Sequence, residues 1–239
     1  ALLIFRFVKG VKDDTSYYAT LDDHLNNRPS GWRLIMSGPR WALLADDDAE
    51  VVSRWGKLGD VFDVKVGFVT GLDAAYKVAC PEGFEPGCVQ QQVTTKRVGE
   101  WFINVNHIDR EEDLPASVAE HLGRWYDRLL SRRIARFDQS NWWKYGAVRN
   151  ADAMASDRRR IYVLAKTRSS APFFTHPVRH YTGGVLGLFL RDGWEDVELE
   201  ELVSFLNSPL YRRLFEGMFL TSSNKVSFQP ATLADVPFP

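Results

Sequence analysis

The alternation of apolar and polar residues predicts a half-buried strand over residues 61–68. In the stretch LGDVFDVKVGFVTG, apolar side chains at positions 62, 64, 66 and 68 alternate with Asp63, Lys65 and Gly67, which is the two-residue period of a strand with one face in the core. Because Gly67, Thr70 and Gly71 interrupt the pattern, we expect the strand to run into a loop. Upstream, residues 1–8 and 31–36 predict two further strands, and residues 46–59 a short helix with an acidic start.

A helical period replaces this alternation after residue 114. Pro115 is a suitable first residue for a helix. The apolar stripe of that helix consists of Val118, Leu122, Trp125 and Leu129. Its basic row, spaced by four residues and therefore on one side, consists of Arg124, Arg128, Arg132 and Arg136. Such a row is either a solvated surface or a surface that faces an anion.

The second half of the chain continues as a mixture of strands and helices. Residues 157–168 predict an apolar strand with basic ends, and residues 172–191 predict strands around Gly183 and Gly184. Residues 196–215 predict a helix that is interrupted at Pro209 and then resumes. The predicted elements give a mixed α and β protein of one or two lobes.

Composition and charge add one strong feature to this pattern. The 239 residues are 45% hydrophobic and 13% aromatic, which is typical of a globular protein, and no apolar run is long enough to span a membrane. The net charge is only -1, but residues 121–180 carry 13 Lys and Arg against 4 Asp and Glu. A basic third within a neutral chain indicates one face for a polyanion.

Metal and redox chemistry have little support in the sequence. Cys80 and Cys88 have no nearby Cys or His pair that would complete a zinc site, and we expect two unpaired thiols in a reducing cytoplasm. His176 and His180 are four residues apart, but Pro177 lies between them and prevents the helix that paired ligation needs. Phosphate-binding, dinucleotide-binding and hydrolase motifs are absent from the sequence.

Four ordered segments carry a resemblance to a known family. The first is a G-x-x-T-G-x-[ND] loop after a strand, at Gly67, Thr70, Gly71 and Asp73. A tryptophan-aromatic-glycine segment before a basic strand follows at Trp142, Trp143, Tyr145 and Gly146. A leucine-asparagine-serine helix and a terminal [IV]-P-x-P loop complete the order at Leu206, Asn207 and Ser208, and at Val236, Pro237 and Pro239. Over residues 30–239 the chain resembles the C-terminal target-recognition (TaqI-like specificity) domain of N6-adenine DNA methyltransferases and restriction-modification enzymes.

The resemblance implies an α+β fold with curved, mostly antiparallel sheets flanked by helices. It also implies double-stranded DNA as a partner and S-adenosyl-L-methionine as the cofactor of the complete enzyme. The catalytic Asn/Asp-Pro-Pro-aromatic tetrapeptide and the glycine-rich cofactor loop are absent from the sequence, so we expect catalysis and cofactor binding in an N-terminal methyltransferase domain outside this chain. Residues 1–28 would then be a remnant of that domain, and residues 29–239 the DNA target-recognition domain.

A methyltransferase acting on adenine N6 must rotate the base out of the duplex while other contacts hold the site. Cations and polar groups then contact phosphates, and side chains read base edges. The expected DNA-binding residues are Thr70, Gly71, Trp142, Trp143, Tyr145, Arg149, Lys166, Arg168, Ser222, Ser223, Asn224 and Lys225. Asp73, an anion, is expected to brace its loop instead.

Several alternatives remain open at this point. The three aromatic residues at 142, 143 and 145 are either core residues or a stacking surface for bases. The segment either serves a methyltransferase alone or serves a fused restriction endonuclease as well. It is otherwise a general single-strand binder or a module whose basic helix docks an acidic protein. The recognition sequence and the oligomeric state do not follow from the residues.

Overall fold

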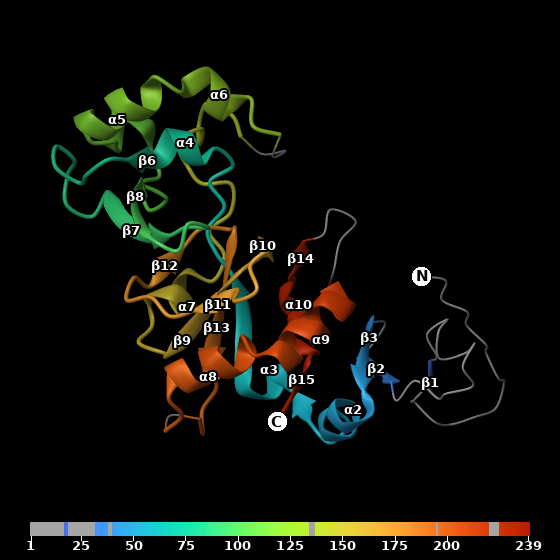
Figure 1. Cartoon of the computed structure of the whole chain (residues 1–239). Helices are drawn as coiled ribbons and strands as arrows, with labels where there is room; N and C mark the ends of the chain where they lie inside the picture. The colour runs from blue at the N-terminus through green and yellow to red at the C-terminus, as the bar shows by residue number, and fades with distance from the viewer. Residues whose placement is uncertain (1–16, 19–31, 38–39, 134–136, 195, 220–224) are drawn as a thin grey trace. The chain divides into compact units, whose positions relative to one another are not determined.

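A computed structural model describes residues 17–18, 32–37, 40–133, 137–194, 196–219 and 225–239 (Figure 1). The strand predicted over residues 1–8 and the proposed division at residue 28 lie outside these ranges. The chain splits into two compact units. Unit 1 comprises residues 1–64, 166–173 and 190–239, and unit 2 comprises residues 65–165 and 174–189.

Unit 1 contains an antiparallel sheet in the order β1-β2-β3, with β1 at Tyr17–Tyr18, β2 at Trp32–Ser37 and β3 at Arg40–Ala45. Helix α2 follows at Asp46–Val52, with three aspartates in its first turn; the sequence predicts this acidic start, but the helix ends at Val52 and not at residue 59 as expected. Helix α9, at Pro209–Phe219, packs against β3. The strand predicted over residues 31–36 is therefore confirmed as β2.

The remaining elements of unit 1 are short and join residues far apart in the sequence. Strand β4 at Gly56–Lys57 pairs with β15 at Pro237–Phe238, and β10 at Lys166–Thr167 pairs with β14 at Val226–Ser227. Helix α3 at Leu58–Val61 contacts α10 at Pro230–Ala234. Helix α8 at Leu199–Leu206 ends before Pro209 begins α9, so the predicted interruption is confirmed.

Unit 2 contains a sheet in the order β12-β7-β8-β6. These strands lie at His180–Tyr181, Val89–Val93, Gly99–Ile103 and Lys77–Val78. Its pairs are antiparallel except β12 with β7, which is parallel. Another four-stranded sheet has the order β11-β9-β13-β5, with strands at Phe173–Phe174, Arg160–Leu164, Val185–Leu190 and Phe62–Val66; β9 belongs to unit 2, and the boundaries between the two units fall within the other three strands. Strands β9 and β13 are buried at every residue, and β5 confirms the strand predicted over residues 61–68.

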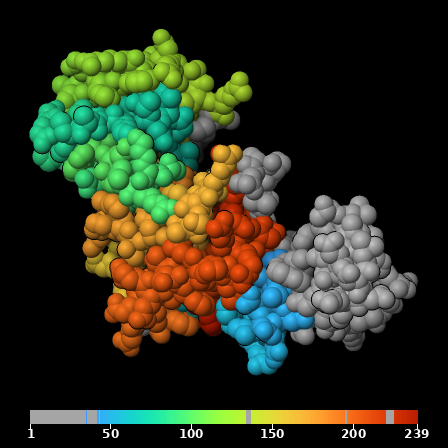
Figure 2. Space-filling view, viewed as in Figure 1, coloured from blue at the N-terminus to red at the C-terminus, as the bar shows by residue number. Residues whose placement is uncertain are grey.

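The helices of unit 2 correct one prediction. They are α4 at Asp73–Tyr76, the 3-10 helix η1 at Glu111–Asp113, α5 at Ala116–Gly123, α6 at Tyr126–Leu130 and α7 at Ala151–Ala155. The single helix predicted after Pro115 is thus two short helices that lie at the surface of the unit (Figure 2). The buried stripe is confirmed for Val118, Leu122 and Leu129, which have no exposed surface, whereas Trp125 is partly exposed. The basic row is wrong as far as Arg132, because α6 ends before that residue, and Arg136 lies outside the described residues.

The described residues therefore form a mixed α and β protein with several mostly antiparallel sheets, which is compatible with the predicted α+β class. One cluster of buried side chains fills the interior of unit 2; it includes Tyr76 and Tyr145, whose rings meet edge to face, and residues of β9 and β13 such as Leu164 and Val185. None of the helices in the described ranges is long and apolar enough to cross a membrane.

Candidate nucleic-acid interface

The loop that follows β5, residues 67–73, is fixed on one side by the chain around residues 181–183. The amide of Phe68 donates to Tyr181 O at 2.9 Å, and the amide of Gly183 donates to Phe68 O at 2.7 Å. A Cβ atom on Gly67 would lie 2.3 Å from Thr182 O and 2.4 Å from Tyr181 O, so only glycine allows this approach. We call residues 67–73 the recognition loop, after the DNA contacts that the family resemblance predicts for Thr70 and Gly71.

Polar side chains inside the recognition loop stabilise its shape. The Thr70 hydroxyl is buried; it donates to Asp73 Oδ1 at 2.5 Å and accepts from the amide of Leu72 at 3.1 Å. Gly71 adopts a φ of 80°, a backbone conformation that glycine reaches without a steric penalty. The predicted bracing role of Asp73 is therefore confirmed. Thr70, expected to contact DNA, uses its hydroxyl within the loop, whereas Gly71 is exposed.

A second segment, residues 146–150, runs alongside the recognition loop. Val69 and Ala147 exchange two main-chain hydrogen bonds, at 3.0 and 2.9 Å, and Gly146 donates to Thr70 O at 3.3 Å. The Asn150 side chain donates to Val66 O at 3.1 Å. Arg149 lies between these attachment points and is exposed, so the structure holds one predicted DNA-binding cation next to the loop.

Arg132 connects the recognition loop to the tryptophan-rich segment. Its guanidinium donates hydrogen bonds, at 2.6 to 3.0 Å, to Tyr76 Oη and to the carbonyl oxygens of Leu129, Thr70, Lys144 and Trp142. It also lies 3.7 Å from the centroid of the Phe137 ring. Burial lowers the pKa of Arg132, and the Tyr76 hydroxyl opposes this effect. Sequence reasoning assigned Arg132 to an exposed row and missed this role, because its partners lie up to 62 positions away.

The tryptophan-rich segment belongs to the core. Trp142, Trp143 and Tyr145 are only 1–3% exposed. Tyr145 Oη donates to Ile103 O at 2.6 Å and accepts from Gln92 Nε2 at 3.0 Å, and burial raises the pKa of Tyr145 far above its ordinary value. The core interpretation of these three rings is confirmed. The expectation that they stack on bases is corrected, because none of the three presents an open ring face.

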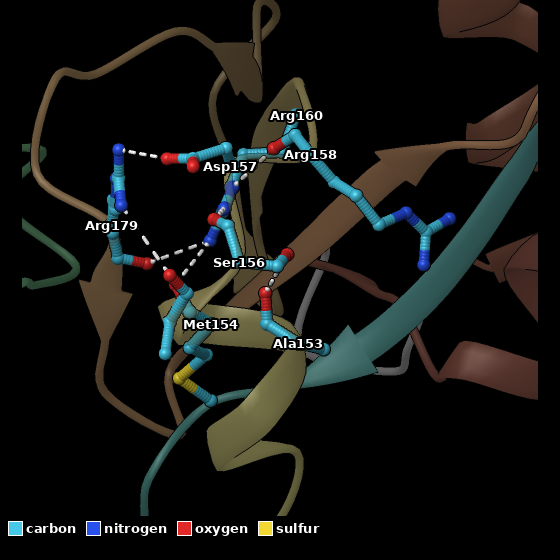
Figure 3. Close-up of polar contacts among 8 residues, drawn as sticks. Ala153, Met154, Ser156, Asp157, Arg158, Arg160 and Arg179 are labelled. Atoms are coloured by element: carbon cyan, nitrogen blue, oxygen red, sulfur yellow. Dashed lines mark hydrogen bonds and ion pairs between the residues drawn. The ribbon is translucent and has the colours of Figure 1, made fainter.

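A second arginine of the basic third, Arg160, is also buried and hydrogen-bonded within the protein. Arg160, 7% exposed, donates to Met154 O, Ser156 O, Arg158 O and Arg179 O (Figure 3). Its guanidinium lies 4.4 Å from the centroid of the Phe189 ring. Arg179 forms an ion pair with Asp157. Arg160 and Arg179 therefore anchor the end of α7 to the chain before β12.

The basic third does not form one uniform cationic surface. Arg124 pairs with Glu120 at 2.5 Å, and Lys144 pairs with Asp109 at 2.8 Å. Among the predicted DNA-binding cations, Arg149 lies exposed in unit 2, whereas Lys166 and Arg168 lie exposed in unit 1. Several arginines thus have structural partners, and the expected gathering of the whole third into one surface is wrong. Exposed cations remain in each unit.

The terminal loop is described only in part. Ser222, Ser223 and Asn224 lie outside the described residues, and Lys225 is partly exposed directly before β14. Cys80 and Cys88 are unpaired, as predicted. Within the described ranges, no three His, Cys, Asp or Glu side chains gather in a way that could hold a metal ion.

Comparisons with known proteins add no family assignment. No protein-family model matches the chain, and a search of curated protein sequences finds no match.

Proposed function

We propose that the chain recognises a specific sequence in double-stranded DNA as part of an N6-adenine DNA methyltransferase. One observation carries the proposal. Two of the motifs behind the family resemblance, the recognition loop and the tryptophan-aromatic-glycine segment, meet in unit 2 together with the turn at Gly183 and Gly184, although residues 67 and 184 are more than a hundred positions apart in the sequence. Binding residues lie disproportionately on loops that a rigid scaffold holds in position, and these three segments are such loops.

The proposed work divides between this chain and a methyltransferase domain. That domain would bind S-adenosyl-L-methionine and carry out methyl transfer on a base rotated out of the duplex. In this chain, Arg149, Lys166, Arg168 and Lys225 are charged candidates for phosphate contacts, which fix the position of the protein. The main chain at Gly71 is a further candidate, because a glycine lets DNA approach the backbone closely.

The alternatives differ in what supports them. A general single-strand binder would need exposed stacking surfaces, and the rings expected to supply them are buried. A specificity domain for a fused restriction endonuclease would recognise DNA with the same residues and is part of the same proposal. A protein-docking module has lost its main support, because the continuous basic helix is not present.

The test measures binding of the chain to labelled duplexes selected from a randomised library. We expect a selected duplex to bind at least about 10³-fold more tightly than a scrambled one. Arg149→Ala should weaken binding and reduce the slope of log K against log salt concentration by about 0.9, the contribution of one phosphate contact. The matched control is Arg124→Ala, which removes the same charge from an exposed ion pair at the C-terminal end of α5 and should leave the slope unchanged.

Two results would overturn the proposal. The first is that selection enriches no sequence and the affinity for duplex stays at the nonspecific level of about 10⁻⁴ to 10⁻⁶ M. The second is tighter binding to single strands than to duplexes of the same sequence.

A further inference from the structure

An open hollow lies in the surface of unit 2 beside the recognition loop. It has a volume of about 430 Å³ and is lined by Phe68, Val69, Gly71, Leu72, Asp73, Gly183 and Gly184. Its lining is mainly apolar or glycine, and Val69 is 38% exposed, which is unusual for a large aliphatic side chain in this protein. A Cβ atom on Gly183 would lie 2.8 Å from Val69 Cγ2, so glycine at this position leaves room for the Val69 side chain.

Asp73 is the one charged residue in this lining. Its Oδ1 atom accepts the Thr70 hydroxyl, and this bond fixes the orientation of the carboxylate. Within the described residues, Oδ2 has no hydrogen-bond partner, and the residue is exposed. The hollow therefore combines apolar walls with one oriented acceptor that carries a negative charge.

This chemistry excludes a phosphate and selects among base edges. A carboxylate repels phosphate, so the hollow does not contact the DNA backbone through Asp73. In the major groove, thymine presents an acceptor, guanine presents two, and adenine places an acceptor beside its amino group. Cytosine alone presents the N4 amino donor without an acceptor beside it, and carboxylates accept from that group. The neighbouring C5 edge of cytosine is apolar and matches Val69.

We propose that this hollow reads a cytosine in the major groove, with Asp73 Oδ2 accepting a hydrogen bond from N4 and Val69 contacting C5. The assignment rests on the proposed function, because it needs duplex DNA at this surface. It gives Asp73 a second role beside the bracing of the loop, and it makes the hollow a determinant of sequence rather than of affinity for phosphate.

The test compares the wild-type chain with Asp73→Asn by selection from a randomised duplex library. The asparagine Oδ1 can still accept the Thr70 hydroxyl, whereas its amide nitrogen now offers donors to the hollow. We expect one cytosine position in the selected sequence to change to thymine, whose O4 is an acceptor. Affinity for the original duplex should fall roughly 5- to 150-fold. The control Asp152→Asn neutralises an exposed carboxylate on α7 and should leave the selected sequence unchanged.

A change in the DNA alone tests the same contact without a variant. N4-methylcytosine at the selected position keeps its pairing with guanine but replaces the groove-facing hydrogen of N4 with a methyl group. It should weaken wild-type binding by a factor similar to that of Asp73→Asn, and it should have little further effect on the variant. This comparison remains informative if the variant folds poorly.

The outcomes separate the inference from the proposed function. Selection that enriches no sequence for the wild-type chain refutes both. A selected sequence that is identical for the wild type and Asp73→Asn, together with full tolerance of N4-methylcytosine at every cytosine, overturns the cytosine site and leaves duplex recognition standing.

Discussion

Replacement of Arg132 by alanine tests whether one guanidinium holds the recognition loop in place. The side chain donates to four carbonyl oxygens and one hydroxyl from three separate segments. Two acceptors keep another donor after the change, because Thr70 O also accepts from Gly146, and Lys144 O also accepts from Tyr76 Oη. Leu129 O and Trp142 O have no second donor within the described residues.

The expected loss of stability follows from those two carbonyl oxygens. A buried acceptor without a partner costs about 1–3 kcal/mol. Arg132 is partly buried, and burial lowers its pKa; removal of the charge therefore recovers part of its desolvation cost. Solvent also reaches part of the site. We expect Arg132→Ala to lower the free energy of unfolding by about 2–4 kcal/mol. The free energy of unfolding of Arg132→Lys should lie between those of the wild type and Arg132→Ala.

Urea unfolding followed by tryptophan fluorescence measures this loss, because Trp142 and Trp143 lie in the affected region. Hydrogen exchange at the amides of Gly146 and Ala147 should also become faster, because these groups bond to the loop that Arg132 holds. The control is Arg133→Ala at the next, exposed position, which should change stability by less than about 0.5 kcal/mol. Equal unfolding midpoints and slopes for the two alanine variants would refute the reasoning.

Two further changes probe the same unit. Gly67→Ala should cost about 3 kcal/mol or more, because its Cβ would lie 2.3 Å from Thr182 O; Gly123→Ala, with nothing within 4 Å, should be neutral or stabilising in urea unfolding. Burial, and then the nearby guanidinium groups of Arg160 and Arg179, lower the pKa of His180. The unfolded chain therefore binds the proton at a higher pH than the folded chain does. The free energy of unfolding should fall as the pH drops from about 7 through 6.5, by up to about 1.4 kcal/mol per pH unit. Denaturation midpoints between pH 7.5 and 5 should decline less for His180→Gln than for the wild type; an unchanged decline would contradict this.

The spacing of apolar residues in the sequence correctly predicted several strands and helices, because this spacing reflects which face of a local element is buried. The alternation around residue 64 gave β5, and Pro209 divided α8 from α9. The stripe that contains Val118 and Leu129 was also right about burial, although the helix stops at Arg124. A glycine at position 123 weakens the helix there, and two short helices still bury the same apolar positions.

The spacing of charged residues did not predict which arginines are buried, because the partners of these side chains are main-chain groups from distant parts of the sequence. Nothing in the spacing of Arg132 or Arg160 separates them from Arg124, which lies on the surface with a neighbouring glutamate. Arg132, which is partly buried, and Arg160, which is buried, bond to carbonyl oxygens that become available only where helices end and loops meet. The bracing of the recognition loop by Asp73 was predictable, because its partner is three residues away.

The partners of Arg132 and Arg160 have a further consequence for the protein in acid. Both guanidinium groups bond to main-chain oxygens, and such oxygens do not titrate. The ion pair between Lys144 and Asp109 instead depends on an ionised carboxylate, and its contribution disappears once that group is protonated. As the pH falls, surface ion pairs are therefore lost first, while the hydrogen bonds of Arg132 and Arg160 to main-chain carbonyl oxygens persist.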